Sequence, residues 1–159
     1  MFGLFKSKSF RDEQLGELAR SRGRWRGSLA LEADVSVPLA LSGTRSEPDP
    51  EAVALAREVA THLATWRPTI EQALFEHYGP YAEAGAAGDP PPASEATPNI
   101  ATSDQVWPHV SLVYVSIALL DGVLTTELGY DTAWDEEHTL GAQFQAGEFI
   151  ELCGSVLPP

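Results

Sequence analysis

The stretch VSLVYVSIALL, residues 110–120, is the most apolar segment of this chain of 159 residues and decides its fold. Its alternating positions are apolar on both faces, which is typical of a strand in the middle of a sheet with something packed on each side. Asp121-Gly122 follows at once, and this dipeptide is the strongest short hairpin signal. The sequence therefore predicts a strand over 110–120 that turns back on itself.

Downstream of this turn the apolar residues continue at a spacing of two. The return strand runs through Leu124, Thr126, Leu128 and Tyr130, and a short strand over 140–144 follows it. Ala146-Gly147 forms the next turn, and the last strand spans 149–153. The C-terminal third is thus predicted to be an antiparallel meander of four strands.

Upstream, the pattern predicts a helix and a hairpin. Ser9 followed by Asp12 resembles a capping box, and the apolar spacing after it predicts a helix over 9–21. Period-two alternation predicts strands near 24–32 and 35–42. Pro38 cannot donate to a ladder, so we expect the second of these strands at an edge, or with its unpaired side outward.

The middle of the chain is predicted to be a helical pair followed by a loop. Asp49-Pro50-Glu51 is a strong helix start, and the first helix is expected over 50–65. Thr69 with Gln72 forms another candidate capping box, for a second helix that ends by Gly79-Pro80. Residues 82–99 are rich in Ala, Gly and Pro and are expected to form a flexible loop.

We therefore expect a single α+β domain over residues 1–159. Its antiparallel sheet would combine an N-terminal hairpin with the C-terminal meander, and the helical pair would pack on one face. Since 110–120 is apolar on both faces, the second face would be covered by the N-terminal helix, by the long loop, or by a second subunit in a homodimer. Residues 1–8 are expected to be a flexible N-terminus.

Charge is distributed unevenly along the chain. Lys and Arg number 10 against 23 Asp and Glu, a formal charge of −13, which disfavours nucleic acid as a partner. Residues 1–26 carry +4, whereas residues 68–159 carry 14 acidic side chains and no Lys or Arg, Arg67 being the last. A field of one sign speeds encounter with a positive partner, so a basic protein is the partner we expect.

Compartment and targeting follow from what the sequence lacks. Its single Cys cannot form an intramolecular disulfide, and two lysines interrupt the first eight residues, so we expect neither a secretory signal nor an oxidising compartment. Phe2, Leu4 and Phe5 beside Lys6 and Lys8 would suit a membrane surface, but a frayed terminus is the preferred interpretation. A cytoplasmic protein is the expectation.

The segment DTAWDEEH, residues 131–138, is the densest group of titratable side chains. We predict a binding site here from residues that lie together between two strands: Asp131, Trp134, Asp135, Glu136, Glu137 and His138. In the simplest interpretation the turn is solvated, Trp134 anchors it to the core, and His138 pairs with a nearby acid. Carboxylates and an imidazole also suit a divalent ion, with Asp135, Glu137 and His138 as ligands, although the spacing matches no standard metal motif.

Other catalytic signals are weak. No G-x-S-x-G elbow, P-loop or dinucleotide-binding glycine turn is present. Cys153 falls within a predicted strand and is expected to be a small core residue. His62 and His77 lie beside apolar stripes, where a histidine with one hydrogen bond is the expected role, and His109 marks the entry into the sheet. We predict no catalytic residue and no resident cofactor apart from the divalent ion considered above.

Trp134 to Gly141 resembles the W-D-x-E-H-G-L-G signature of uncharacterised bacterial domains, some of which lie in loci that encode toxins and their immunity proteins. An early W-x-G strand (Trp25, Gly27) and late glycines (Gly147, Gly154) are also similar. This chain has Thr139 where glycine is usual, which argues against a positive φ there. The resemblance implies a small bacterial cytosolic domain.

Two functions follow as hypotheses. The preferred one is a non-enzymatic, acidic, immunity-like module that binds a basic protein. The alternative is a metal-dependent enzyme in which Asp131, Asp135, Glu136, Glu137 and His138 hold an ion that polarises a water or a substrate oxygen.

Overall fold

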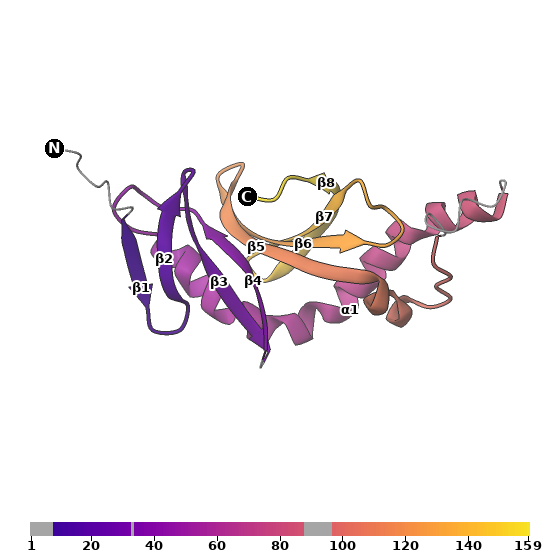
Figure 1. Cartoon of the computed structure of the whole chain (residues 1–159), viewed down its shortest axis with the longest axis horizontal. Coiled ribbons are helices and arrows are strands. Elements are labelled where there is room, and N and C mark those ends of the chain that lie inside the picture. The colour runs from indigo at the N-terminus through magenta and orange to yellow at the C-terminus, as the bar shows by residue number, and fades with distance from the viewer. Residues whose placement is uncertain (1–7, 33, 88–96) are drawn as a thin grey trace.

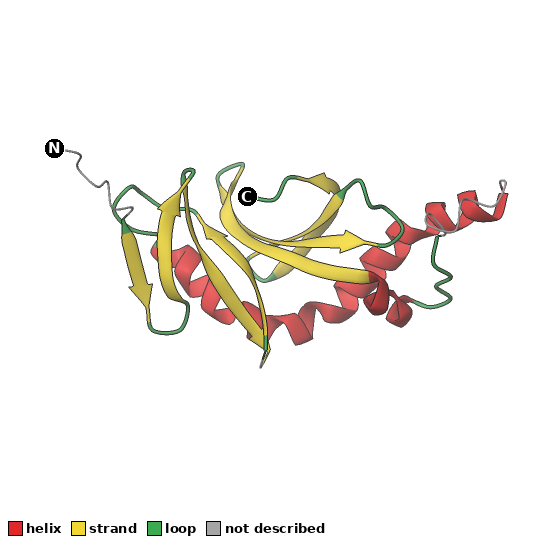
Figure 2. Ribbon diagram, in the orientation of Figure 1, coloured by secondary structure: helices red, strands yellow, loops and turns green. Residues whose placement is uncertain are grey.

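The computed structural model describes residues 8–32, 34–87 and 97–159, and it is an α+β fold (Figures 1 and 2). Eight strands form one sheet in the order β1 to β8, and a single long helix, α1, runs along one face of it. The α+β class predicted from the sequence is confirmed. The layout differs from the prediction, because the N-terminal strands and the meander belong to one continuous sheet.

The C-terminal meander forms as predicted. Its strands are β5 (Val110–Leu120), β6 (Val123–Thr132), β7 (Thr139–Gln145) and β8 (Glu148–Val156), and the neighbours within this set of four pair antiparallel. At the two tight turns, Asp121-Gly122 and Ala146-Gly147, all four residues have positive φ, between 50° and 82°. This is the type I′ geometry that matches the twist of the flanking strands.

The predicted helix over 9–21 is wrong, because these residues form the strands β1 (Ser9–Asp12) and β2 (Gly16–Ser21). Asp12 does not cap a helix; its Oδ2 accepts the backbone N–H groups of Gln14 and Leu15 at 2.9 and 2.8 Å and closes a turn. Gly16 then has a φ of +76°, which ends any helical path. Asp12 is also buried and paired with Arg57, so a long-range contact fixes the hairpin.

The next two strands match their predicted ranges closely, as β3 (Arg24–Glu32) and β4 (Val35–Leu41). Of the two placements predicted for Pro38, the one at an edge of the sheet is wrong, since β4 lies between β3 and β5. It pairs with β5 in parallel over Leu39–Leu41 only, so this ladder begins just after the proline. A residue without an N–H is tolerated at such a limit of pairing.

The predicted helical pair is wrong, because α1 (Pro50–Ala87) is continuous through Pro68 and Pro80. It begins at Pro50, as predicted, where Asp49 accepts the N–H of Glu51 at 2.9 Å. On either side of Pro68 the buried stripe of Val59, Trp66, Ile70 and Leu74 continues without a break. Burial of this stripe against the sheet outweighs the hydrogen bond that an internal proline removes.

The predicted loop over 82–99 begins later than expected, since helix α1 reaches Ala87. Residues 88–96 of this loop lie outside the described residues. The same holds for residues 1–7 of the predicted flexible N-terminus. The 3-10 helix η2 (Ser103–His109) then leads into β5, as expected for His109. None of the described helices is both long and apolar enough to span a membrane.

The core lies between α1 and the sheet. On the opposite face of the sheet, Tyr114 packs over Gly129, where an added Cβ would stand 2.1 Å from the ring. Its hydroxyl donates to Glu127 at 2.6 Å, and burial together with this bond raises the tyrosine pKa. The helix predicted over residues 9–21 as a possible cover for this face is not formed, since these residues belong to β1 and β2. Toward the β5–β6 turn, Leu119 and Leu120 are 63% and 42% exposed.

Candidate functional site

The acidic segment singled out in the sequence forms the end of β6 and the loop to β7. Asp131, on β6, is exposed and accepts the hydroxyl of Thr139 at 2.7 Å across the hairpin. Thr139 begins β7 and is not among the described non-glycine residues with positive φ. The departure from glycine at this position is therefore compatible with the local backbone.

Trp134 anchors this loop to α1, as the simplest interpretation predicts. Its side chain is buried, and its ring meets that of Tyr78 edge-on with 5.5 Å between centroids. Its indole N–H donates to Nδ1 of His77 at 3.0 Å. Burial lowers the pKa of His77, which keeps the imidazole neutral and able to accept this hydrogen bond. The loop is thus fixed to the helix at this point.

The carboxylate of Asp135 is buried and bonds both to α1 and within its own loop. Its carboxylate accepts the hydroxyl of Tyr81 at 2.7 Å and contacts Nδ1 of His138 at 3.0 Å. Burial acts to raise its pKa, but the hydrogen bonds from Tyr81 and His138 outweigh it and the pKa is lowered. The pairing of His138 with a nearby acid is confirmed, and this carboxylate serves the fold.

The six predicted binding residues are therefore only partly brought together. Asp135 and His138 pair, whereas the side chains of Glu136 and Glu137 are exposed and Asp131 bonds elsewhere. Within residues 8–32, 34–87 and 97–159, no group of three His, Cys, Asp or Glu side chains is placed to hold a metal ion. The three-ligand set of Asp135, Glu137 and His138 thus remains a prediction from sequence.

The remaining candidates play minor parts. His62 stacks on Trp66 with 5.1 Å between ring centroids, and His77 makes the single hydrogen bond described above. The prediction that Cys153 is a core residue is wrong. Cys153 lies on the edge strand β8, is partly exposed, and is a free thiol.

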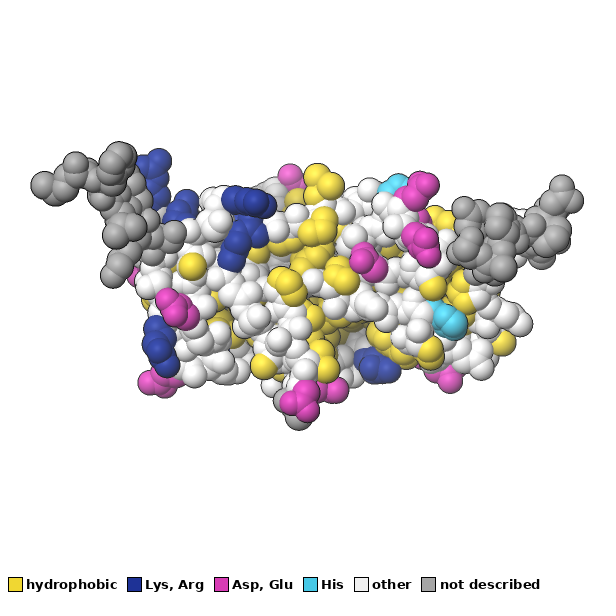
Figure 3. Space-filling view, viewed as in Figure 1, with side chains coloured by type: hydrophobic (Ala, Val, Ile, Leu, Met, Phe, Trp, Pro, Cys, Tyr) yellow, Lys and Arg dark blue, Asp and Glu magenta, His cyan; other side chains and the backbone are white. Residues whose placement is uncertain are grey.

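Surface charge is divided between the two halves of the sheet. In the view of Figure 3, most Lys and Arg side chains gather near β1 to β4, where Asp and Glu also occur. Hydrophobic side chains form a band across the middle, and beyond it Asp and Glu outnumber Lys and Arg. The exposed carboxylates of β5 to β8 and the turns between them belong to residues 121, 131, 136, 137, 148 and 151. The uneven charge of the sequence is thus also uneven in space.

Strand β8 is one edge of the sheet, so the outward side of its backbone has no partner strand among the described residues. It is nine residues long, with Glu148 and Glu151 exposed and Ile150 49% exposed. Its end, Val156, pairs with Thr139 and so lies next to the acidic loop. The edge therefore combines free backbone groups with carboxylates near both of its ends.

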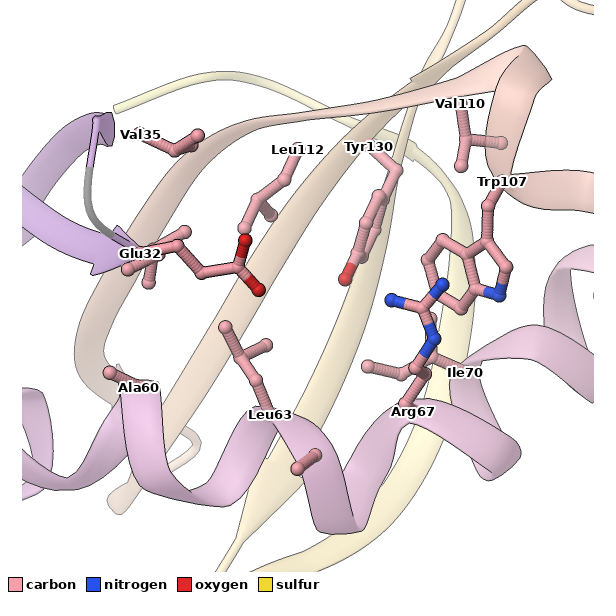
Figure 4. Close-up of a pocket in the computed structure, with 12 residues that line it drawn as sticks. Glu32, Val35, Ala60, Leu63, Arg67, Ile70, Trp107, Val110, Leu112 and Tyr130 are labelled. Carbon is pink, nitrogen blue, oxygen red and sulfur yellow. The ribbon is translucent and has the colours of Figure 1, made fainter.

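A cavity of about 380 Å³ lies between α1 and the sheet, where β4 separates from β5 (Figure 4). Its walls are mainly apolar, and its polar side chains are Glu32, Arg67, Trp107 and Tyr130. The guanidinium carbon of Arg67 is 4.1 Å from the centroid of the Trp107 ring. Sequence reasoning did not find this cavity, because its lining comes from four distant segments. The one lining residue that the sequence singled out was Arg67, as the last basic residue of the chain.

No curated protein and no solved structure matches this chain. A family model does match it, over residues 14–156, and its description is "Domain of unknown function (DUF6985)". The match covers nearly all of the sheet and the whole of α1, and we conclude that the chain belongs to this family.

Proposed function

We propose that this domain is a non-enzymatic, immunity-like module that binds a basic protein through its acidic C-terminal half. The observation that carries the proposal is the edge strand β8, with exposed carboxylates and no Lys or Arg after Arg67. A sheet edge adds a strand from a partner through backbone hydrogen bonds, and its side chains select the sequence that pairs.

The negative charge of β8 disfavours its pairing with β8 of a second molecule. In the antiparallel register that sets Glu148 of one β8 strand opposite Glu151 of another, like charges would face each other, and this disfavours self-association in that register. A strand with Lys or Arg at the facing positions, and an apolar residue to meet Ile150, would pair without that cost. Proteins that act on nucleic acid carry such basic segments, which suits the resemblance to domains of toxin and immunity loci.

Charge reversal on β8 tests this function. The double variant Glu148→Lys/Glu151→Lys and the matched control Glu13→Lys/Glu17→Lys change the net charge equally, and the control lies at the other end of the sheet. Each would be used with the wild type to capture proteins from the native host at low and high salt, followed by mass spectrometry. We expect one basic partner, captured by the wild type and the control at low salt and lost with the β8 variant.

Hydrogen exchange on the isolated complex then locates the contact. Strand addition predicts slower exchange of the β8 amides, with little change in β1. Recovery of no specific partner at low salt, or equal capture by the β8 variant, would count against the proposal.

The metal-dependent enzyme remains the alternative, and it has its own test. It predicts a co-purifying divalent ion and a melting temperature raised by Mg²⁺, Mn²⁺ or Zn²⁺ in the wild type but not after Asp135→Asn. Elemental analysis of the purified protein, with melting curves in each ion, decides the matter. Less than about a tenth of an equivalent of metal and no thermal shift would remove this alternative.

A further inference from the structure

The cavity beside Arg67 has features of a ligand site that are independent of the acidic edge. It exists because β4 pairs with β5 only over Leu39–Leu41, so that the strands separate beyond this point and α1 closes the space between them. Most of the lining is apolar: Leu31, Val35, Ala60, Leu63, Ala64, Ile70, Val110 and Leu112. At about 380 Å³ it falls at the lower end of the range for small-molecule pockets.

Two hydrogen-bond donors face this space without a partner in the described part of the chain. Tyr130 is only 3% exposed, and Figure 4 shows its hydroxyl pointing into the cavity toward Arg67. Burial raises the pKa of Tyr130 although Arg67 opposes this effect, so the phenol stays a neutral donor. Arg67 is exposed, makes no salt bridge to any described carboxylate, and is held over the ring of Trp107.

Arg67 and Tyr130 converge on this space with no hydrogen bond or ion pair to a described residue, Glu32 included, so an anion would pair with both. A carboxylate suits a guanidinium fork and a phenol hydroxyl together, because its two oxygens accept both. Glu32 extends toward the same space from β3, as Figure 4 shows, and its negative charge disfavours a ligand that carries two charges. The apolar walls would take an uncharged hydrocarbon body.

We propose that this cavity binds a small amphipathic monocarboxylate, with its carboxylate on Arg67 and Tyr130 and its hydrocarbon part among the apolar side chains of α1, β4 and β5. The hydroxyl of Tyr130 favours ligands that carry a hydrogen-bond acceptor. Trp107 holds Arg67 in position through a cation–π contact.

Titration with octanoate, followed by heteronuclear NMR and calorimetry, tests the proposal below the concentration at which octanoate forms micelles. We expect saturable binding, with the largest shifts at Leu63, Arg67 and Leu112. Arg67→Met should weaken binding about tenfold or more, and Tyr130→Phe several-fold. Glu32→Gln should strengthen it. Melting curves of each variant check the fold, which should be retained because Arg67 is exposed and Tyr130→Phe keeps the ring.

Octan-1-ol is the matched neutral probe, and its affinity should not change with Arg67→Met. Absence of saturable octanoate binding would overturn the proposal. So would octanoate binding that is equally strong in Arg67→Met, because the apolar walls would then act alone. Charge reversal on β8 should leave octanoate binding unchanged, so this test and that of the proposed function fail separately.

Discussion

The loop over 133–138 and the cavity beside Arg67 each bring a tryptophan and a tyrosine together with charged side chains near α1, yet they use their polar groups in opposite ways. In the loop, Trp134 donates to His77 and Asp135 accepts from Tyr81. In the cavity, the hydroxyl of Tyr130 has no hydrogen-bond partner among the described residues, and Arg67 has no carboxylate. The polar groups of the acidic loop therefore stabilise the fold, whereas those of the cavity keep unused hydrogen-bonding capacity.

This difference separates a structural cluster from a binding site. A buried polar group with a partner contributes to stability, and its removal leaves that partner unsatisfied. A buried polar group without one costs stability, and a structure retains it more readily where a ligand completes it. Substitutions that measure stability should therefore act strongly in the loop and weakly in the cavity.

The largest effect is expected for Trp134→Ala. The substitution removes a buried ring from its contact with Tyr78 and leaves His77 without its donor, so the free energy of unfolding should fall by about 3–5 kcal/mol. Urea denaturation at neutral pH measures this change. Leu119→Ala, at a side chain that is 63% exposed, is the control and should change stability by less than about 1 kcal/mol. Similar losses in both variants would contradict an anchoring role for Trp134.

A smaller loss, about 1–3 kcal/mol at pH 7, is expected for Asp135→Asn, which removes the charge that Tyr81 and His138 hold. Because the folded pKa of Asp135 lies below its unfolded value of 3.8, the ionised carboxylate stabilises the fold above about pH 4 and loses this effect as the pH falls through the folded pKa. The gap between wild type and variant should therefore narrow at pH 3. Urea curves at both pH values measure it, and a gap that widens in acid would exclude this role.

The fold was predictable wherever local turn chemistry and periodicity agree. Asp121-Gly122 and Ala146-Gly147 specify their hairpins without help from the rest of the chain, and the meander followed from them. Residues 9–21 were mispredicted because Phe10, Leu15 and Leu18 also fit a helical stripe. The deciding contacts are the pairing of Asp12 with Arg57, 45 positions away, and the positive φ of Gly16.

The candidate sites show the same limit. The anchoring of Trp134 was predictable, because a large aromatic residue in a polar turn is usually buried. The cavity was not, because Glu32, Arg67, Trp107 and Tyr130 are brought together only by the limited pairing of β4 with β5 and by the path of α1 through Pro68. Neither feature has a local signal in the sequence.

The smallest change in stability is expected for the removal of a tyrosine hydroxyl. Two buried tyrosines allow a comparison, because the hydroxyl of one has hydrogen-bond partners and that of the other has none among the described residues. The hydroxyl of Tyr78 donates to the carbonyl of Pro98 at 2.5 Å and accepts the buried N–H of Ile100 at 3.1 Å, so Tyr78→Phe should cost about 1–2 kcal/mol. Tyr130→Phe should cost less than about 0.5 kcal/mol, or stabilise the protein, because it removes a donor that no described residue satisfies. Thermal and urea denaturation of the ligand-free protein distinguish the two. An equal loss for both would mean that the hydroxyl of Tyr130 already serves the fold, and the contrast between the loop and the cavity would disappear.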